Sequence, residues 1–226
     1  ISMSQDADGA VRPDKKNPLL AAGQELRLPA GIELIVEDFS NLPSPHITVE
    51  TMFELKDRIK EAKQEGLDSV VITHGTDTLE ETAYFLEMTI GDLMPIILTG
   101  AMRSINELGS DGLYNFECAI RVAASENAIG KGVLVVMNDE VHSARYVTKT
   151  HTTNVATFRT PTLGPIGLVT KSKILFKQEL PETTRYDIDS FDAMIPIIKV
   201  FAGMQGDFFK ILDHAITVDG LVVEAL

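Results

Sequence analysis

Short apolar runs alternate with stretches of helical spacing along the chain. Within Thr48 to Glu65 apolar residues recur every three or four positions, and Gly66 follows as a stop signal, which predicts a helix. The run Ser69 to Thr73 is short and continuously apolar, as expected for a central parallel strand with both faces covered. The same criteria predict strands at 31–37, 94–99 and 132–137 and helices at 79–88 and 113–125. This alternation indicates an α/β fold with a doubly wound, mostly parallel sheet.

The pattern changes from about Glu140 onward. Residues 162–176 are rich in Thr, Gly and Pro and predict a β-hairpin that flanks the sheet, and the polar, acidic residues that follow predict a linker. A further strand, helix and strand are predicted at 195–201, 208–215 and 221–223. Because one such unit cannot bury its own apolar faces, a second domain is expected to be truncated. The predicted organisation is an N-terminal α/β domain, a linker and the start of a smaller C-terminal α/β domain, at 1–177, 178–193 and 194–226.

Polar side chains cluster in three turns that follow predicted strands. The turns are 73–78 (THGTDT), 99–103 (TGAMR) and the loop 138–150, which carries Arg145 and Lys149. In an open α/β sheet, ligands bind at the carboxyl ends of the strands. All three turns are therefore expected on the ligand-binding edge of the sheet.

The first turn also has an ordinary structural interpretation. Thr78 followed by Glu81 fits a capping box, and Asp77 near a helix start is favourable to the helix dipole. Gly75 then only permits a tight turn. A cap needs one hydroxyl or carboxylate, however, and this turn offers several polar side chains. The excess indicates a function beyond capping.

The residue types in these turns suit nucleophilic catalysis by threonine. A threonine hydroxyl is a poor nucleophile unless a base removes its proton, and a lysine acts as that base when burial lowers its pKa. Thr76, Asp77 and Lys149 supply the hydroxyl, an orienting carboxylate and the amine, although spacing alone leaves open whether Lys149 is simply exposed to solvent. Helix N-terminal N–H groups and the backbone of Ala101 are candidates for stabilising negative charge on a carbonyl oxygen.

Composition narrows the classes of partner. The net charge of −13 argues against nucleic acid, whose phosphates are bound by clustered Lys and Arg. Cys118 is the one cysteine in this sequence, so a disulfide within it is excluded and a buried structural thiol is expected. No apolar run approaches the ~20 residues of a membrane span. No metal-ligand spacing such as HExxH occurs.

Five blocks of sequence resemble the bacterial L-asparaginase family. They are VVITHGTDTLEETAYFLE (70–87), LTGAMRS (98–104), SDGLYNF (110–116), VVMNDEV (135–141) and VTKTHTTNVATF (147–158). The blocks follow in the order and spacing of the family, and the resemblance extends over the whole chain. It implies an amidohydrolase that converts L-asparagine and water to L-aspartate and ammonia without a metal or organic cofactor. It also implies a homodimer or homotetramer in the intact protein, with no nucleic acid and no membrane as partner.

The resemblance implies roles for individual residues. Thr76 and Lys149 match a Thr–Lys–Asp triad with Asp77, which also matches a contact to the substrate α-amino group. Ser44 matches the serine that binds the α-carboxylate, and Ala101 matches a backbone contact near the scissile amide. Thr76, Asp77, Ser44 and Ala101 are thus the expected substrate-binding residues.

The chain departs from the family pattern at several positions. Ile1 matches the isoleucine of the family's TGGTI motif, so the principal nucleophilic threonine and the first strand are expected just before the chain begins. Residues 2–17 match the family's mobile lid but contain no tyrosine. Pro45 stands where many periplasmic-type members have glutamine, so that contact is expected to be lost or replaced. His74 matches a position that is structural and not catalytic.

The implied mechanism is double displacement through an acyl-enzyme, and the 226-residue chain itself is expected to be inactive because the nucleophile is absent. Two enzymatic alternatives stay open. A glutaminase-asparaginase differs by a pocket volume of about one methylene, or ~1–3 kcal/mol, and an amidase subunit for tRNA amidation shares the THGTDT turn. A catalytically dead amino-acid-binding module would keep Ser44 and Asp77 without needing an activated hydroxyl. We expect a cytoplasmic location, with secretion or the periplasm as alternatives because Ile1 is not a start residue.

Overall fold

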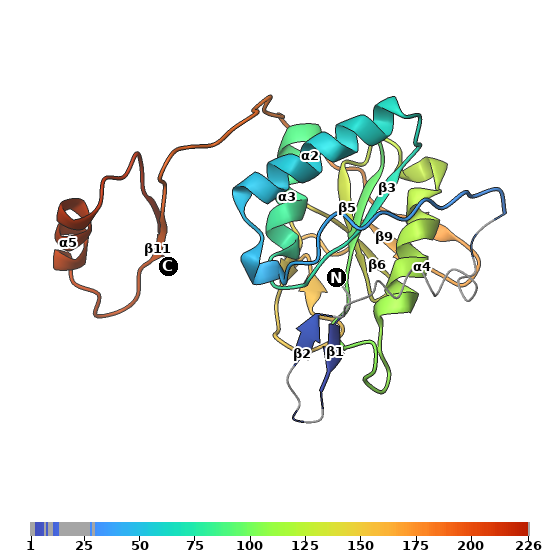
Figure 1. Cartoon of the computed structure of the whole chain (residues 1–226), viewed down its shortest axis with the longest axis horizontal. Helices are drawn as coiled ribbons and strands as arrows, with labels where there is room; N and C mark the ends of the chain where they lie inside the picture. The colour runs from blue at the N-terminus through green and yellow to red at the C-terminus, as the bar shows by residue number, and fades with distance from the viewer. Residues whose placement is uncertain (1–2, 7, 9–10, 14–27, 29, 226) are drawn as a thin grey trace. The chain divides into compact units, whose positions relative to one another are not determined.

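A computed structural model describes residues 3–6, 8, 11–13, 28 and 30–225 of the chain (Figure 1). The chain divides into two compact units, Ile1–Asp187 and Ile188–Leu226. The division falls inside the stretch 178–193 that the sequence predicts to be a linker.

The first unit is built on a six-stranded sheet with the strand order β10-β9-β6-β5-β4-β3. Three neighbouring strands are parallel: β3 (Val70–Thr73), β4 (Ile96–Thr99) and β5 (Val133–Met137). Three more pair antiparallel: β6 (Glu140–Ser143), β9 (Gly167–Val169) and β10 (Ile174–Phe176). Because β9 is antiparallel to β6, it runs in the same direction as β3 to β5. The sheet is therefore mainly parallel, with the predicted hairpin β9–β10 at one side.

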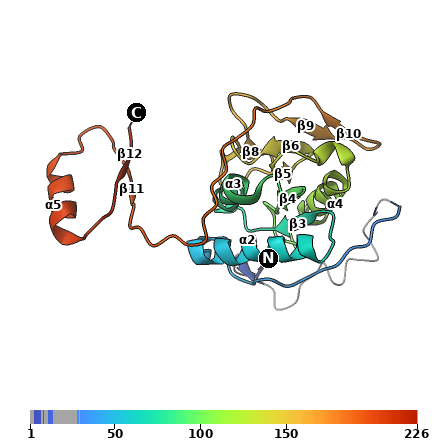
Figure 2. The same cartoon turned by 90° about the horizontal axis from the view of Figure 1, so that it is seen from above.

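Helices cover both faces of this sheet (Figures 1 and 2). They are α2 (Val49–Gln64), α3 (Leu79–Ile90) and α4 (Gly112–Ala123). Side chains on successive strand residues point to opposite faces, so Ile96 and Leu98 pack with α2 and α3 while Ile97 packs with α4. This two-sided burial explains why β4 and β5 are buried at every position. The doubly wound α/β prediction is confirmed.

Shorter elements complete the first unit. They are β1 (Met3–Gln5), β2 (Val11–Pro13), β7 (Thr148–Lys149), β8 (Phe158–Arg159) and the 3-10 helices η1 (Ser44–His46) and η2 (Glu126–Ala128). β1 pairs antiparallel with β2 inside the expected lid segment 2–17, and the remainder of that segment lies largely outside the described residues. β7 pairs antiparallel with β8. Among the described helices none is long and apolar enough to cross a membrane.

The second unit is a strand–helix–strand unit, as the sequence predicts. β11 (Ile197–Lys199) and β12 (Val222–Glu224) are parallel neighbours, and α5 (Asp207–Ala215) lies between them in the chain. Several large apolar side chains of this unit are exposed to solvent: Ile197, Phe201, Phe208, Ile211, Val222 and Val223. A strand–helix–strand unit of this size, considered by itself, is too small to bury its own apolar faces.

The structure differs from the predicted elements in two segments. Residues 31–37 form no strand, although their side chains alternate between exposed and half-buried. Alternation predicts an extended backbone, but a strand also needs a hydrogen-bonded neighbour, and β3 pairs among the described strands with β4 alone. The predicted loop 138–150 is not irregular throughout, because it contains β6 and β7.

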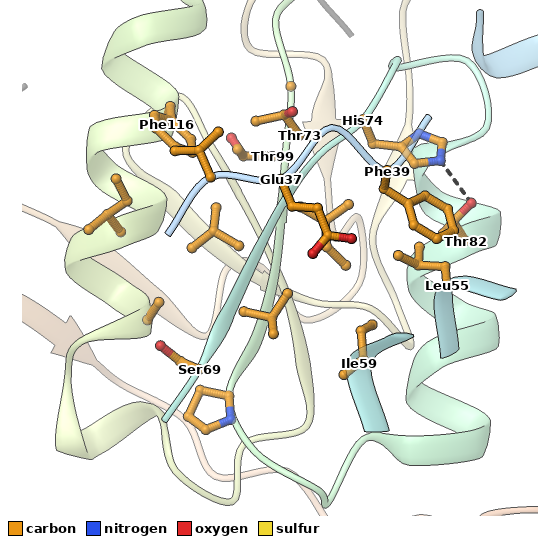
Figure 3. A pocket seen from close by; sticks show the side chains of 18 of the residues that line it. Glu37, Phe39, Leu55, Ile59, Ser69, Thr73, His74, Thr82, Thr99 and Phe116 are labelled. Carbon is orange, nitrogen blue, oxygen red and sulfur yellow. Dashed lines mark hydrogen bonds between the residues drawn. The ribbon is translucent and has the colours of Figure 1, made fainter. Parts of the chain in front are cut away.

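A long groove separates the extended segment 31–39 from β3 (Figure 3). Its walls include Leu55 and Ile59 from α2 and Phe116 from α4. The groove continues past the carboxyl ends of β3 and β4, where the turn residues predicted to bind ligand also line it. One groove therefore joins the open edge of the sheet to the candidate site.

Candidate active site

The turn after β3 carries Thr76 and Asp77 to the start of α3. Thr78 occupies the N-cap position of α3, but its side chain makes no capping hydrogen bond. Its hydroxyl instead donates to the Ser44 carbonyl oxygen at 2.8 Å. The capping-box interpretation of Thr78 and Glu81 is therefore wrong, because the hydroxyl ties the turn to η1.

Ser44 is packed into the same turn. It is buried, and its Oγ accepts a hydrogen bond from the Asp77 N–H at 3.2 Å. A Cβ atom at Gly75 would lie 2.7 Å from both Cβ and Oγ of Ser44, so only glycine permits this approach. The acceptor role leaves the Ser44 hydroxyl proton free to point toward a ligand.

Lys149 reaches this turn from β7. Its Nζ lies 2.9 Å from Thr76 Oγ1 and 2.6 Å from Asp77 Oδ1. The Lys149 side chain is 15% exposed, whereas that of Asp77 is 61% exposed. The interpretation of Lys149 as a solvent-exposed lysine is therefore wrong. The structure brings together a hydroxyl, an amine and a carboxylate from distant parts of the sequence.

Glu80, in the first turn of α3, holds the backbone beside Lys149. Its carboxylate accepts hydrogen bonds from the Lys149 backbone N–H and from Thr148 Oγ1, the latter at 3.3 Å. The sequence patterns predict no role for Glu80. An acidic residue in a first helical turn is ordinarily explained by the helix dipole, so its type and position did not indicate this contact.

His74 is buried beneath the turn. Its Nδ1 lies 2.7 Å from the Gly75 carbonyl oxygen, and its Nε2 lies 3.0 Å from Thr82 Oγ1 (Figure 3). A carbonyl oxygen only accepts, so Nδ1 carries the proton and Nε2 accepts from the Thr82 hydroxyl. Burial lowers the pKa of His74 and favours this neutral form. Both ring nitrogens are used inside the fold, which agrees with the structural role expected for His74.

The turn after β4 is fixed through its main chain. The Asp111 carboxylate accepts from the backbone N–H groups of Met102 at 3.1 Å and Arg103 at 3.0 Å. It also accepts from the side-chain amide of Asn115 at 3.0 Å. Ala101, the expected backbone contact to substrate, lies exposed just before these anchored residues.

Asn115 completes the support of this second turn. It is 1% exposed, and its Nδ2 donates to the Gly100 carbonyl oxygen at 3.0 Å while its Oδ1 accepts from the Asn138 N–H at 3.0 Å. The turn after β4 is thereby joined to the turn after β5. The block SDGLYNF contains both Asp111 and Asn115, but the sequence interpretation assigned neither a role.

Comparison with known proteins identifies the family. A family model described as "Asparaginase, N-terminal" matches residues 1–182. The chain belongs to the asparaginase family. It is 35% identical over 200 residues to an L-asparaginase of Bacillus licheniformis, covering 88% of this chain and 62% of that protein. It is 44% identical over 138 residues to a glutaminase-asparaginase of Pseudomonas fluorescens biotype A, covering 61% of this chain and 38% of that protein.

A solved structure of the asparaginase family is similar as well. The crystal structure of a probable cytoplasmic L-asparaginase from Campylobacter jejuni aligns with a TM-score of 0.76 and 33% sequence identity. The alignment covers 82% of this chain and 61% of that one. The chain thus spans less than two thirds of the length of these relatives.

Arg145 lies between β6 and β7 and pairs with a buried glutamate, not with the turn that carries Thr76. Its Nε lies 3.6 Å from a carboxylate oxygen of Glu87, which is 1% exposed and also 3.6 Å from Arg185. The Val133 N–H donates to Glu87 at 2.7 Å. Burial raises the pKa of Glu87, and this N–H and both guanidinium groups oppose that rise. Arg145 therefore anchors the loop that precedes β7.

Three remaining features of the sequence are a cysteine, the residue types that bind metals, and Pro45. Cys118 is buried in α4, as predicted, and burial raises the pKa of its thiol. Within the described part of the chain, no group of His, Cys, Asp and Glu is arranged to hold a metal ion. Pro45 lies exposed in η1, next to Ser44.

Proposed function

We propose that this chain carries the N-terminal part of an L-asparaginase, which hydrolyses the side-chain amide of L-asparagine to L-aspartate and ammonia. The observation that carries the proposal is the contact of Lys149 Nζ with both Thr76 Oγ1 and Asp77 Oδ1 at the carboxyl end of β3. A hydroxyl beside an amine that is oriented by a carboxylate is the arrangement for threonine activation. The names of the asparaginase relatives support the same substrate.

The proposed chemistry is double displacement. A threonine hydroxyl attacks the amide carbon and its proton passes to a base, the C–N bond breaks, and ammonia leaves after gaining a proton. Water then attacks the ester carbon and gives up a proton, the bond from that carbon to the threonine oxygen breaks, and the threonine regains its proton as aspartate is released. Lys149 Nζ contacts Thr76 Oγ1 and Asp77 Oδ1, so the neutral amine is placed to take the proton of the Thr76 hydroxyl. Asp77 then stabilises the ammonium that forms.

The principal nucleophile is proposed to be the threonine of the family's first strand, and Thr76 with Lys149 and Asp77 forms the supporting triad. The open edge of β3 beside the groove suits a further parallel strand, because its outer backbone groups have no strand partner among the described residues. A strand in that position would end beside the turn that carries Thr76.

Substrate contacts follow from the free groups of the site. The Ser44 hydroxyl proton is available to an α-carboxylate, because Ser44 Oγ already accepts from Asp77 N–H. The Asp77 side chain is 61% exposed and can receive an α-ammonium group while it holds Lys149. Thr76 and the backbone of Ala101 would face the scissile amide. These contacts select an amino-acid amide and do not separate asparagine from glutamine.

The test is ammonia release from L-asparagine and L-glutamine, measured for the 226-residue chain and for a longer form that begins with the family's first strand. We expect the longer form to release ammonia chiefly from asparagine and the shorter chain to release none. Turnover by the shorter chain would disprove the proposed nucleophile. A folded longer form that releases nothing but binds asparagine by calorimetry would favour the binding module.

Assembly and location are part of the same proposal. We infer a homodimer or homotetramer for the intact protein, to be measured by light scattering after gel filtration. We also infer a cytoplasmic location, which the name of the Campylobacter jejuni structure supports. Recovery of the intact protein from a periplasmic extract would contradict it.

A further inference from the structure

We propose that Glu80 is a positioning residue that fixes Lys149 against Thr76. The inference rests on the proposed function of the Thr76–Lys149 pair, and it assigns a task to a residue that belongs neither to the triad nor to the substrate contacts. The contacts of the Glu80 carboxylate with the Lys149 backbone N–H and the Thr148 hydroxyl carry it.

The Glu80 carboxylate accepts a backbone hydrogen bond of β7 that a second neighbouring strand would otherwise accept. β7 is only two residues long and pairs on one side with β8. Along a strand, successive N–H groups point to opposite sides. The Thr150 N–H donates toward β8, to the Thr157 carbonyl oxygen at 2.9 Å, so the Lys149 N–H points to the opposite side. On that side the Glu80 carboxylate accepts the hydrogen bond from the Lys149 N–H.

Both ends of Lys149 are thereby held by one continuous piece of chain. Thr76 and Asp77 receive the Nζ, and Glu80 receives the backbone N–H of the same residue. Residues 76–80 comprise the end of the turn and the first turn of α3, which is buried against the core through Leu79. Because residues 76–80 bind both the Nζ and the backbone N–H of Lys149, they fix the distance from Lys149 Nζ to Thr76 Oγ1.

The ordinary explanation of Glu80 is a favourable interaction with the dipole of α3. Glu81 lies in the same first helical turn and has the same charge, but its side chain is exposed. A dipole effect would be similar for the two residues. Glu81 is therefore the matched control for Glu80.

The experiment uses the 226-residue chain and needs no turnover. Trace acetylation with acetic anhydride labels neutral amines, and mass spectrometry gives the rate at Lys149 relative to exposed Lys171. We expect Glu80→Ala to raise this ratio about fivefold, since a lost hydrogen bond of β7 frees Nζ from Thr76 and Asp77. Glu80→Gln retains an acceptor oxygen and should stay near the parent ratio, as should Glu81→Ala.

Two results would overturn the proposal. One is an unchanged ratio in folded Glu80→Ala, and the other is an equal rise in Glu80→Gln and Glu80→Ala, which would assign the effect to charge. If Glu80→Ala loses its thermal transition, Thr148→Val removes one partner of the carboxylate and must raise the ratio, because an unchanged ratio there also rejects the idea. The acetylation ratio tests the role of Glu80 alone, whereas ammonia release tests the proposed function, so the two can fail independently.

In the longer, active form the same variants separate positioning from folding. We expect Glu80→Ala to lower kcat by about 100-fold with little change in KM, as for other small misplacements of catalytic groups. Glu80→Gln should recover most of kcat. Equal kcat in Glu80→Ala and Glu81→Ala would contradict a positioning role.

Discussion

The turns after β3 and β4 lie at neighbouring strand ends but are built in different ways. The β3 turn presents side chains, and Ser44 and Lys149 come from other segments to meet its Thr76 and Asp77. The β4 turn is held through its main chain, whose N–H and carbonyl groups are bound by Asp111 and Asn115. One sheet edge thus combines a turn that supplies chemical groups with a turn that supplies a fixed backbone.

This difference predicts different consequences of substitution. Changes to Thr76, Asp77 and Lys149 should alter turnover more than stability, because these three side chains are partly exposed. Changes in the support of the second turn should alter stability first, because buried donors would lose their acceptor. The following predictions test that division, in decreasing order of expected effect.

The largest effect is expected for Lys149→Ala in the active, longer form. Loss of the amine should lower kcat/KM about 1,000-fold, in the range for removal of an acid–base group. Stability should change by less than about 1 kcal/mol, because the partner Asp77 is 61% exposed. Ammonia release and urea denaturation measure the two quantities. With Lys171→Ala as control, a loss of activity under tenfold would contradict the division.

The second effect is expected for Asp111→Ala. The backbone N–H groups of Met102 and Arg103 and the Asn115 amide would lose their shared acceptor. The free energy of unfolding should fall by about 3 kcal/mol. Urea denaturation of the 226-residue chain measures it, with exposed Asp68→Ala as control. Equal unfolding free energies for the two variants would show that the β4 turn is not held in this way.

A smaller effect is expected for Gly75→Ala. The new Cβ would lie 2.7 Å from Ser44 Cβ and Oγ, so Ser44 must shift. We expect a loss of about 2 kcal/mol of stability from overpacking and a raised KM in the active form. Gly206→Ala is the control, because a Cβ there meets nothing within 4 Å. A variant with unchanged KM would remove Ser44 from the substrate contacts.

The smallest effect concerns pH and His74. Because burial lowers the pKa of His74 in the folded state, the unfolded chain binds more protons as the pH falls below about 6.5, and stability falls with it. One such group contributes a slope of at most about 1.4 kcal/mol per pH unit. Urea denaturation at about pH 7.5 and 5 should show a smaller difference for His74→Gln than for the parent chain. Exposed His46→Gln should keep the parent difference.

The sequence predicts the buried parts of the fold well. β4 and β5 are apolar at every position, and the helices show clear spacing with stop signals. The apolar pattern does not predict β6, because this strand includes the polar residues Glu140, His142 and Ser143, which are partly or fully buried beside residues that are distant in sequence. The segment 31–37 was assigned wrongly because alternation does not reveal whether a neighbouring strand exists.

The sequence predicts the position of the candidate site but not the residues that hold its backbone in place. Strand ends and residue types indicate Thr76, Asp77 and Lys149, and the family resemblance adds Ser44. Glu80 and Asn115 bind main-chain groups that lie 69 and 15 residues away, and Asp111 binds groups eight and nine residues away. Every segment carries backbone N–H and carbonyl groups. A side chain that binds one of them therefore produces no periodicity or residue spacing by which the contact could be predicted.

The buried Glu87 carboxylate restricts which substitutions the chain can accumulate. A Cβ at Gly91 would lie 2.4 Å from its Oε2, and one at Gly132 would lie 2.3 Å from the same atom. The carboxylate cannot turn away freely, since it is bound to the Val133 N–H and paired with two arginines. Glycine is therefore required at the end of α3 and just before β5 for as long as position 87 carries this carboxylate. A shorter side chain at 87 would still release neither position, because a Cβ at Gly91 would also lie 2.8 Å from the Glu87 carbonyl oxygen and Gly132 has a φ of +76°.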